Sequence, residues 1–458
     1  MVKLAPEIFK AYDIRGVVGR TLTPDAVRAI GQVLGTLAAE RSRAAIVVGR
    51  DGRLSGPALL DALAAGILAS GTDVIDVGMV ATPMTYFAAE HLGTKCSVMV
   101  TGSHNPPDYN GLKMVIDGGT LSGAEIQSLR ARIERGDVRS GLGSRRTQDI
   151  APAYFERITG DVRLARSMKI AVDCGNGVAG AFAPELYWRL GCEVFELFCD
   201  VDGHFPNHHP DPSQPKNLED LKRRLAQGDC ELGLAFDGDG DRLGVVTPAG
   251  NVIYADRQLM LFAADVLSRV PGATVIYDVK STRNLKPWIE RHGGVPLLWK
   301  TGHSLIKAKM KEVGAALAGE MSGHTFFGER WYGFDDGLYA GARLLEILAR
   351  HPDPAAVLDA LPNAISTPEL NIACDEGEQH ALIKKLQASA EFPGATDVIR
   401  IDGLRVEYPD GFGLARASNT TPMIVLRFEA DNKAALARIQ DAFRRVLTAA
   451  KPGVTLPF

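Results

Sequence analysis

The chain alternates short apolar runs with stretches of helical periodicity, and the alternation recurs three times. In the first unit, an apolar run at 44–48 precedes a polar turn, a helical pattern at about 57–69, and apolar runs at 73–77 and 96–100. The corresponding runs of the next two units are 169–172, 184–190, 193–198 and 232–236, and then 274–277, 285–291, 295–299 and 315–318. Strands that alternate with helices are typical of α/β units with largely parallel sheets. We therefore expect three similar mixed α/β domains.

The last part of the chain departs from this repeat. After a proline-containing stretch near 361–368 come two helical patterns, at 378–388 and 433–449, several short apolar runs, and a glycine-rich segment that we expect to be a loop. This composition predicts a smaller α+β domain. The fold class is therefore α/β, with three similar domains plus a smaller C-terminal domain that could share a central cleft. The predicted domains are 1–150, 151–253, 254–366 and 367–458.

Composition narrows the class of protein. The chain has 458 residues, a formal net charge of −4 and no basic block, which argues against a nucleic-acid partner. Its six cysteines form no Cys-x-x-Cys pair, and the N-terminus has no apolar core typical of a signal peptide. Since no apolar run is long enough to span a bilayer, we expect a cytoplasmic protein that does not interact with membranes.

An acidic loop follows the third apolar run of the second unit. Asp237, Asp239 and Asp241 alternate with glycines, and an extended segment points all three carboxylates the same way. Such hard oxygen ligands suit Mg²⁺ or Ca²⁺. A calcium-binding EF-hand would need glycine at its sixth position and a carboxylate at its twelfth, where this chain has Arg242 and Pro248. The loop therefore predicts a Mg²⁺ site of the kind that acts on phosphate groups.

The equivalent loop of the first unit carries a serine, Ser103. A serine-hydrolase elbow would need glycine two residues before and two residues after it, but Thr101 and Asn105 stand there. An ordinary polar turn is one reading of this loop. Because the repeat places Ser103 beside the acidic loop, the other reading is a hydroxyl that carries a phosphoryl group next to a bound cation.

Two further polar loops complete the candidate site. The third unit ends in the segment 319–324, where Glu320 and Ser322 could hydrogen-bond sugar hydroxyls. The C-terminal domain offers a loop with one guanidinium, two hydroxyls and one amide, a set that suits the oxygens of a phosphate. These residues are Arg416, Ser418, Thr420 and Asn419.

A dinucleotide-binding fingerprint competes with this interpretation. The segment 175–180 reads G-x-G-x-x-G after an apolar run, with Glu196 near the distance expected for a ribose contact. The repeat, however, makes this segment a strand-to-helix turn with counterparts at 49–53 and 278–282. We favour the structural interpretation over a dinucleotide-dependent oxidoreductase.

With these residues together and in this order, the chain closely resembles the α-D-phosphohexomutase family over essentially its whole length. The resemblance rests on the segments 12–16, 101–106, 237–242, 319–324 and 416–420. It implies reversible phosphoryl transfer between C1 and C6 of mannose and glucose phosphates. Met321 favours this branch over the phosphoglucosamine mutases. A non-enzymatic sugar-phosphate binding protein remains the other alternative.

The resemblance also implies roles for individual residues. It implies a phosphate on Ser103, a Mg²⁺ ion bound by Asp237, Asp239, Asp241 and that phosphate, and a hexose 1,6-bisphosphate as intermediate and activator. The implied substrate contacts are Tyr12, Lys280, His303, Glu320, Ser322, Arg416, Ser418, Asn419 and Thr420. The residues implied in proton or charge transfer are Arg15, Lys113, Arg242 and His324. We expect a monomer whose partners are small-molecule hexose phosphates.

Overall fold

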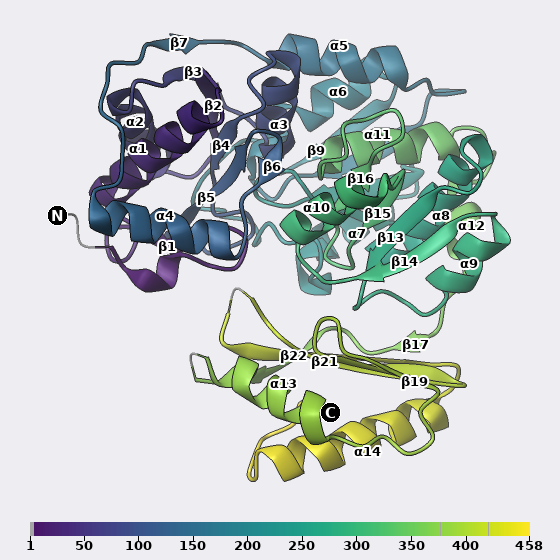
Figure 1. Ribbon diagram of the computed structural model, residues 1–458. Coiled ribbons are helices and arrows are strands. Elements are labelled where there is room, and N and C mark those ends of the chain that lie inside the picture. The colour runs from purple at the N-terminus through teal and green to yellow at the C-terminus, as the bar shows by residue number, and fades with distance from the viewer. Residues whose placement is uncertain (1–3, 376, 420) are drawn as a thin grey trace.

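The computed structural model describes residues 4–375, 377–419 and 421–458. Thr420, one of the predicted phosphate-binding residues, lies outside the described residues. The described strands form four sheets. Figure 1 shows three α/β/α domains packed against one another, with the C-terminal domain, in yellow-green, set apart below them. No helix within the described ranges combines the length and apolar character needed to cross a bilayer.

The first domain is built on a seven-stranded sheet with the order β1-β5-β4-β2-β3-β7, in which β6 pairs with β5. Its strands are β1 (Ile14–Val17), β2 (Ala45–Arg50), β3 (Asp73–Met79), β4 (Ser97–Val100), β5 (Tyr109–Ile116), β6 (Gly119–Thr120) and β7 (Arg145–Thr147). Its helices are η1 (Pro6–Ile8), α1 (Pro24–Glu40), α2 (Gly56–Ala69), α3 (Thr82–His91) and α4 (Ala124–Arg135). The predicted helix at 57–69 and the predicted strands of this unit are confirmed, with bounds that shift by one or two residues.

The second and third domains are smaller versions of the same plan. The second contains β8 (Lys169–Asp173), β9 (Glu193–Leu197), β10 (Leu232–Phe236), β11 (Leu243–Val246) and β12 (Val252–Ile253), with α5 (Ala151–Asp161), η2 (Val178–Ala181), α6 (Ala183–Arg189), η3 (Pro215–Leu218) and α7 (Glu219–Leu225). The third contains β13 (Thr274–Asp278), β14 (Val295–Trp299), β15 (Leu317–Gly319) and β16 (Thr325–Phe327), with α8 (Ala255–Arg269), α9 (Leu285–Arg291), α10 (His303–Val313), α11 (Gly337–Leu348) and α12 (Pro354–Asp359).

The three domains share one sheet core, as the repeat predicts. The shared strand order is β5-β4-β2-β3 in the first, β11-β10-β8-β9 in the second and β16-β15-β13-β14 in the third. In each domain three strands run parallel and the fourth is antiparallel. The loop between the third parallel strand and the antiparallel strand carries Ser103 in the first domain, Asp237–Asp241 in the second and Glu320–His324 in the third. These loops therefore occupy equivalent positions.

The C-terminal domain is an antiparallel sheet with two helices on one face. Its elements are β17 (Ile365–Ser366), β18 (Leu370–Ala373), β19 (Asp397–Ile399), β20 (Leu404–Tyr408), β21 (Gly411–Ala417), β22 (Met423–Ala430), α13 (Glu378–Ser389) and α14 (Lys433–Ala450). The expectation of a glycine-rich loop is wrong, because this segment is the buried central strand β21. A Cβ atom on Gly413 would lie 2.3 Å from the Phe443 ring of α14, so glycine here lets helix and sheet approach closely.

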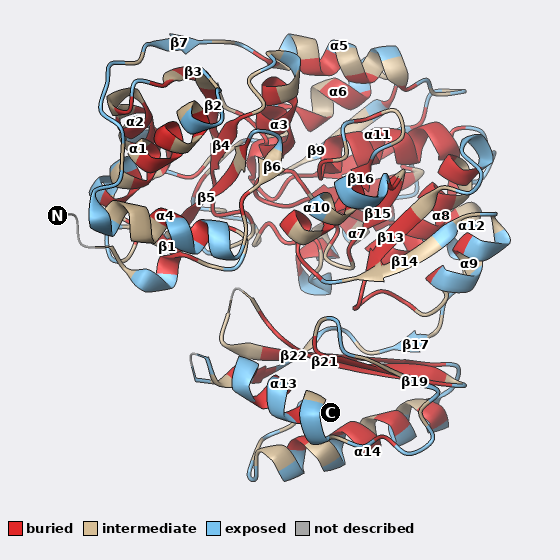
Figure 2. Cartoon of the chain, in the orientation of Figure 1, coloured by how far each residue is buried: buried red, intermediate tan, exposed pale blue. Residues whose placement is uncertain are grey.

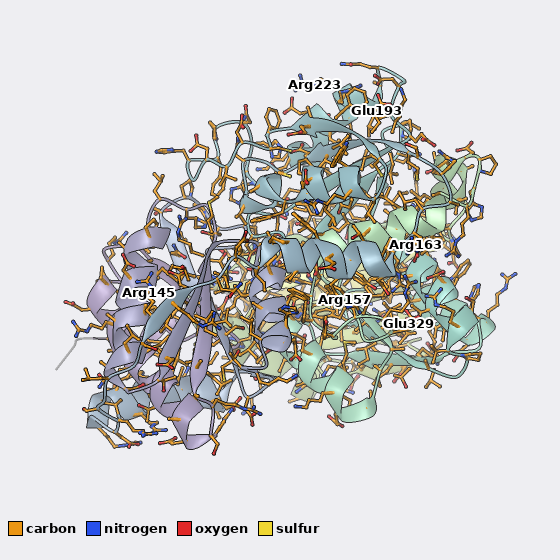
Figure 3. The ribbon with its side chains drawn as sticks, turned by 90° about the horizontal axis from the view of Figure 1, so that it is seen from above. Arg145, Arg157, Arg163, Glu193, Arg223 and Glu329 are labelled. Atoms are coloured by element: carbon orange, nitrogen blue, oxygen red, sulfur yellow. The ribbon has the colours of Figure 1, made fainter. Side chains whose placement is uncertain are left out.

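One continuous apolar core joins the first three domains. It includes Phe87 of α3, Tyr154 of α5, Leu234 of β10 and Tyr339 of α11, whereas the C-terminal domain has a separate core between its sheet and its helices. Figure 2 shows this buried material along the strands of both bodies. Seen from above, Arg145 of the first domain, Glu193 of the second and Glu329 of the third mark three neighbouring parts of the larger body (Figure 3). A shared core favours three domains that move together.

The C-terminal domain rests on the third domain through arginines of its open sheet face. Arg405 donates to the backbone carbonyl groups of Val279 and Ser281, at 2.8 and 2.6 Å. Arg427 donates to the carbonyl group of Lys280 at 2.6 Å. The helices α13 and α14 lie on the opposite face of the sheet (Figure 1). The face without helices is thereby turned toward the loops of the other domains.

Candidate active site

A cavity of about 420 Å³ lies where loops of all four domains meet. Its lining contains every predicted proton-transfer and substrate-binding residue that the structure describes. These are Tyr12, Arg15, Ser103, Lys113, Arg242, Lys280, His303, Glu320, Ser322, His324, Arg416, Ser418 and Asn419. The three aspartates of the acidic loop are fully buried next to this lining. The lining itself has more cations (Arg15, Lys113, Arg242, Lys280 and Arg416) than carboxylates (Asp211, Glu320 and Glu369), and this excess of positive charge suits an anionic ligand.

Ser103 is held in a strained backbone conformation. Its φ of 50° lies in the left-handed region that non-glycine residues rarely adopt. The Thr101 hydroxyl accepts a hydrogen bond from the Ser103 amide at 2.8 Å and donates to the buried carboxylate of Asp51 at 2.7 Å. The fully buried Arg53 guanidinium donates to the Ser103 carbonyl group at 2.8 Å. These contacts hold the strained turn in place at the cavity.

The acidic loop forms a group of oxygen ligands next to Ser103. The candidate ligand atoms of Asp237, Asp239 and Asp241 lie within 4.8 Å of one another, and the Ser103 hydroxyl donates to Asp237 Oδ2 at 3.1 Å. Burial and the neighbouring carboxylates raise the pKa of Asp237 well above its ordinary value. Buried Oδ1 atoms of Asp239 and Asp241 have no hydrogen-bond partner among the described residues. This donor set is able to hold a hard divalent cation.

Lys113 supplies positive charge to the same group. Its Nζ atom donates to Asp239 Oδ2 at 2.7 Å and also to Asp241 Oδ2. Burial lowers the pKa of Lys113, but the two carboxylates outweigh that effect and raise it above its ordinary value. In the metal-free protein, the ammonium group therefore offsets part of the charge on the aspartates.

His324 connects the acidic loop to the predicted sugar-binding loop. Its Nε2 atom lies 3.3 Å from Asp241 Oδ1, and its Nδ1 atom lies 3.1 Å from Glu320 Oε2 and 3.0 Å from the Ser322 hydroxyl. Burial lowers the pKa of His324, yet Asp241 and Glu320 raise it to about 9. A cation bound to the aspartates would weaken this effect and lower the pKa. His324 can thus take part in proton transfer near neutral pH once the aspartates are neutralised.

The lining of the cavity includes two further cations, Lys280 from the third domain and Arg416 from the fourth. Arg416 lies on β21, and its Nε atom donates to Asp402 Oδ2 at 3.0 Å. The same carboxylate oxygen accepts the backbone amide of Thr301 at 3.0 Å. Lys280 forms an ion pair with Glu369 at 3.0 Å. These carboxylates orient the arginine and the lysine across the junction between the two domains.

The predicted phosphate-binding loop is only partly a loop. Arg416 and Ala417 are the last two residues of the strand β21, and Ser418 and Asn419 follow it. The Ser418 hydroxyl lies 2.9 Å from the Thr421 hydroxyl, within hydrogen-bonding distance. The antiparallel pairing of β21 with β22 extends the strand to the edge of the cavity, and therefore fixes the guanidinium on a rigid element.

Aromatic and basic residues of the first domain close the cavity on another side. The ring of Tyr12 packs edge-on against His303, with ring centres 5.3 Å apart. Arg15 donates to Asp13 at 2.6 Å and to the side chain of Asn105 in the Ser103 loop. Burial and two nearby lysines lower the pKa of His303 well below its ordinary value. His303 is therefore neutral at pH 7.

Comparison with known proteins shows which family the chain belongs to. The family models described as phosphoglucomutase/phosphomannomutase match it along its length: alpha/beta/alpha domain I at residues 6–140, domain II at 152–250, domain III at 254–364 and the C-terminal domain at 369–446. The chain belongs to this family. Our prediction of an α-D-phosphohexomutase is confirmed.

Individual members of the family are similar over nearly their whole length. A protein of Neisseria meningitidis named phosphoglucomutase is 62% identical over 450 residues, which are 98% of each chain. One of Pseudomonas aeruginosa named phosphomannomutase/phosphoglucomutase is 56% identical over 99% of this chain and 98% of its own. A solved structure of a phosphoglucomutase/phosphomannomutase family protein from Burkholderia thailandensis is 60% identical, with a TM-score of 0.95 and full coverage of both chains.

Several residues at this family site escaped prediction from sequence. Asp51 and Arg53 position the Ser103 loop, Asp402 positions Arg416, and Glu369 pairs with Lys280. His104, whose Nδ1 atom lies 3.2 Å from the Ser103 hydroxyl, lies in the segment 101–106 that carries the resemblance, but no role was predicted for it. A signal existed only for Asp51 and Arg53, because they lie in the polar turn after the first strand.

The segment that resembled a dinucleotide fingerprint has a packing role in this family fold. A Cβ atom on Gly177 would lie 2.9 Å from Gly238 Cα in the acidic loop, and one on Gly180 would lie 2.0 Å from the carbonyl oxygen of Cys199. The glycines therefore allow close backbone contact inside the second domain. The structural interpretation of this segment agrees with these contacts.

Proposed function

We propose that the chain reversibly transfers a phosphoryl group between C1 and C6 of glucose and mannose phosphates, through a phosphoserine at Ser103 and a hexose 1,6-bisphosphate. The names of the relatives that are 62% and 56% identical support this substrate class over glucosamine phosphates. The observation that carries the route is the Ser103 hydroxyl, 3.1 Å from a buried carboxylate of the acidic loop and facing a cavity with cationic walls.

Mg²⁺ is the cofactor that we assign to the acidic loop. Buried Oδ1 atoms of Asp239 and Asp241, which accept no hydrogen bond from the described residues, fit an oxygen-binding dication. Asp237 together with an oxygen of phosphorylated Ser103 would complete the protein ligands. When bound, the ion would neutralise charge on the phosphoryl group. The acidic loop packs closely against the Ser103 loop, since a Cβ atom on Gly238 would lie 2.4 Å from the Ser103 carbonyl oxygen, and this packing keeps the aspartates near Ser103.

The residues around Ser103 can perform the transfer itself. The phosphorus–oxygen bond to Ser103 breaks as a new bond forms to the free sugar hydroxyl, and the hydroxyl proton leaves to a base. His324 is our candidate for this base. A cation bound to the aspartates would lower its raised pKa toward neutral pH. Arg242 and Arg15, with Lys113, offset the negative charge that spreads over the phosphoryl oxygens.

The far wall would hold the phosphate that does not react. Arg416 offers a guanidinium fixed by Asp402, and Ser418, Asn419 and Thr420 follow it closely in the sequence. We assign sugar hydroxyl contacts to Glu320 and Ser322, and further substrate contacts to Tyr12, Lys280 and His303. After the first transfer the bisphosphate must turn so that its other phosphate faces Ser103. A separate core in the C-terminal domain allows that domain to open for the turn.

A matched pair of serine variants tests this proposal. Ser103→Ala should abolish conversion of glucose 1-phosphate and mannose 1-phosphate, because no oxygen remains to carry the phosphate. Ser97→Ala is the control, since Ser97 is a buried residue of β4, and its hydroxyl has no hydrogen-bond partner among the described residues. Full activity of Ser103→Ala would disprove the phosphoserine route. That the protein is a monomer stays a prediction, which sedimentation can check. That it acts in the cytoplasm also stays a prediction, which cell fractionation can check.

A further inference from the structure

Two cysteines of the second domain lie side by side at the ends of neighbouring strands. Cys174 directly follows β8, and Cys199 comes two residues after the end of the parallel strand β9. Their sulfur atoms are 3.6 Å apart, and the Cys199 thiol donates to Cys174 Sγ. Both are free thiols in the structure. Neither residue lines the cavity, so the proposed transfer does not use this pair.

The backbone holds the two cysteines within reach of a disulfide bond. The Cys174 amide donates to the Leu197 carbonyl group at 3.1 Å, so the two segments stay neighbours beyond their strands. Neighbouring strands lie about 4.8 Å apart, and disulfides join Cα atoms about 4.4–6.8 Å apart. Because Asp173 pairs with Leu197, a regular strand would point Cys199 to the opposite face from Cys174. The left-handed φ of 51° at Phe198 breaks this alternation and brings the two sulfur atoms together.

The Cys174 side of the pair contacts the acidic loop. The Gly177 amide donates to the Cys174 carbonyl group at 2.7 Å, which closes a tight turn. The next amide, that of Val178, donates to the Gly238 carbonyl group of the acidic loop at 3.1 Å. A Cβ atom on Gly177 would lie 2.9 Å from Gly238 Cα, so the turn and the loop are in close contact. A shift of this turn would therefore move the backbone that carries the proposed Mg²⁺ ligands.

The Cys199 side of the pair leads to the turn that supports Ser103. A Cβ atom on Gly203, four residues beyond Cys199, would lie 3.0 Å from Arg53 Cα. The Arg53 guanidinium lies 5.2 Å from the centre of the Phe205 ring and donates to the Ser103 carbonyl group at 2.8 Å. A shift of the chain after Cys199 would therefore reach the support of the serine turn.

We propose that Cys174 and Cys199 form a reversible disulfide bond that lowers the activity of the site. A sulfur–sulfur bond is about 2.05 Å long, so the two sulfur atoms must approach by about 1.5 Å from their separation of 3.6 Å. The segments next to both cysteines are in close contact with loops of the site, so the movement displaces the acidic loop relative to Ser103. The effect on activity rests on the proposed function, whereas formation of the bond does not.

Hydrogen peroxide is the oxidant that we assign to this pair. Cys199 is partly exposed and Cys174 is fully buried, so peroxide reaches Cys199 first. The Cys199 thiolate attacks one peroxide oxygen, the O–O bond breaks, and a sulfenic acid and hydroxide form. The Cys174 sulfur then attacks the Cys199 sulfur, and the sulfenic oxygen leaves as water with the Cys174 proton. Two thiols are thus oxidised to one disulfide as hydrogen peroxide is reduced to water.

Peptide mapping of the whole chain tests whether the bond forms. The reduced protein is treated with hydrogen peroxide, its remaining thiols are blocked with N-ethylmaleimide in denaturant, and it is digested without reductant. Trypsin alone leaves Cys192 and Cys199 in one peptide, so a glutamate-specific protease must also cut at Glu193 or Glu196. We expect cross-linked peptides that contain Cys174 and Cys199 and that dithiothreitol separates.

Mutase assays of the same samples test the effect of the bond. In saturating Mg²⁺, oxidation should lower wild-type activity about 10-fold or more, because a displacement of about 1 Å can cost about 100-fold in rate. Dithiothreitol should restore the activity. Cys199→Ser should match the reduced wild type and resist peroxide, whereas the control Cys230→Ser, which removes another cysteine of this domain, should stay sensitive. If near-ultraviolet circular dichroism shows that Cys199→Ser is unfolded, Cys174→Ala replaces it with the same expectation.

Three results would overturn the proposal. They are the absence of the cross-linked peptides, full activity of the disulfide-bonded wild type, and an equal loss of activity in the folded variant that lacks Cys199 or Cys174. A reduced protein without any mutase activity in Mg²⁺ would instead contradict the proposed function, and the peptide map would still decide whether the bond forms.

Discussion

Replacing Thr101 by valine should remove the hydrogen bonds that support the Ser103 turn, while the side chain at position 101 keeps its shape. The valine keeps the branched shape of threonine but loses the hydroxyl, which accepts from the Ser103 amide and donates to the Asp51 carboxylate, at 2.8 and 2.7 Å. Thr101 is buried, so water cannot replace either partner. The change therefore leaves one amide and one carboxylate oxygen with poorer contacts next to the reacting serine.

The expected size of the effect follows from these two contacts. A hydrogen bond to a charged group contributes about 1.5–3 kcal/mol, and a buried amide left unpaired costs about 1–3 kcal/mol. Asp51 keeps the Gly102 amide and Arg53 as partners, which limits the loss on its side. We expect Thr101→Val to lower the free energy of unfolding by about 2–4 kcal/mol. If half of this energy held Ser103 in its reactive position, kcat/KM would fall about 5- to 30-fold.

The matched control is Thr101→Ser, which keeps the hydroxyl and removes the methyl group. Urea unfolding measures stability, and a coupled assay of glucose 6-phosphate formation at saturating Mg²⁺ measures kcat and KM. We expect Thr101→Ser to keep nearly wild-type kcat/KM. Thr101→Val should have a lower kcat/KM, mainly because kcat falls. Wild-type kcat in a Thr101→Val protein that is measurably less stable would refute the view that this hydroxyl positions Ser103.

Three further predictions concern the Mg²⁺ site, His324 and Arg416. Asp239→Asn should weaken Mg²⁺ activation at least about 10-fold in metal titrations of activity, and an unchanged Mg²⁺ requirement would contradict the ligand assignment. Because the pKa of His324 rises from 6.5 to about 9 in the folded chain, its protonation stabilises the metal-free protein below pH 6.5. Urea unfolding should show about 3 kcal/mol of this stability lost as the pH rises to about 9, and His324→Gln should remove that loss. Asp402→Asn should raise KM more than it lowers kcat, because it loosens Arg416; equal effects on both would count against a binding role.

The regular elements of the three repeats could be predicted because their apolar runs follow strand and helix periods. The strand predicted at 232–236 and the helix at 285–291 have the bounds of β10 and α9. The strand predicted at 315–318 begins later, at Leu317, because the chain is still leaving the left-handed turn at Gly314. Strand β21 was missed because glycines normally disfavour strands. The close approach of β22 at Gly411 and of α14 at Gly413 explains them, and neither can be seen in the sequence.

The loops of the site could be predicted from polar sequences at strand ends and from the family resemblance, but their supports could not. Asp51 and Thr101 are 50 residues apart, and Asp402 reaches Thr301 across 101 residues. No local pattern encodes such contacts, since they depend on how domains pack. For the same reason, no local pattern predicts that Asp335 lies beside His303 and His324.

The phosphorylation of Ser103 is the central claim, and mass spectrometry of the protein during turnover tests it most directly. The purified chain, incubated with Mg²⁺ and glucose 1,6-bisphosphate and then digested, should yield a peptide that carries one phosphate on Ser103. Addition of excess glucose 6-phosphate should remove that phosphate at a rate no slower than kcat. A fully active enzyme whose Ser103 peptide never carries phosphate would contradict the account.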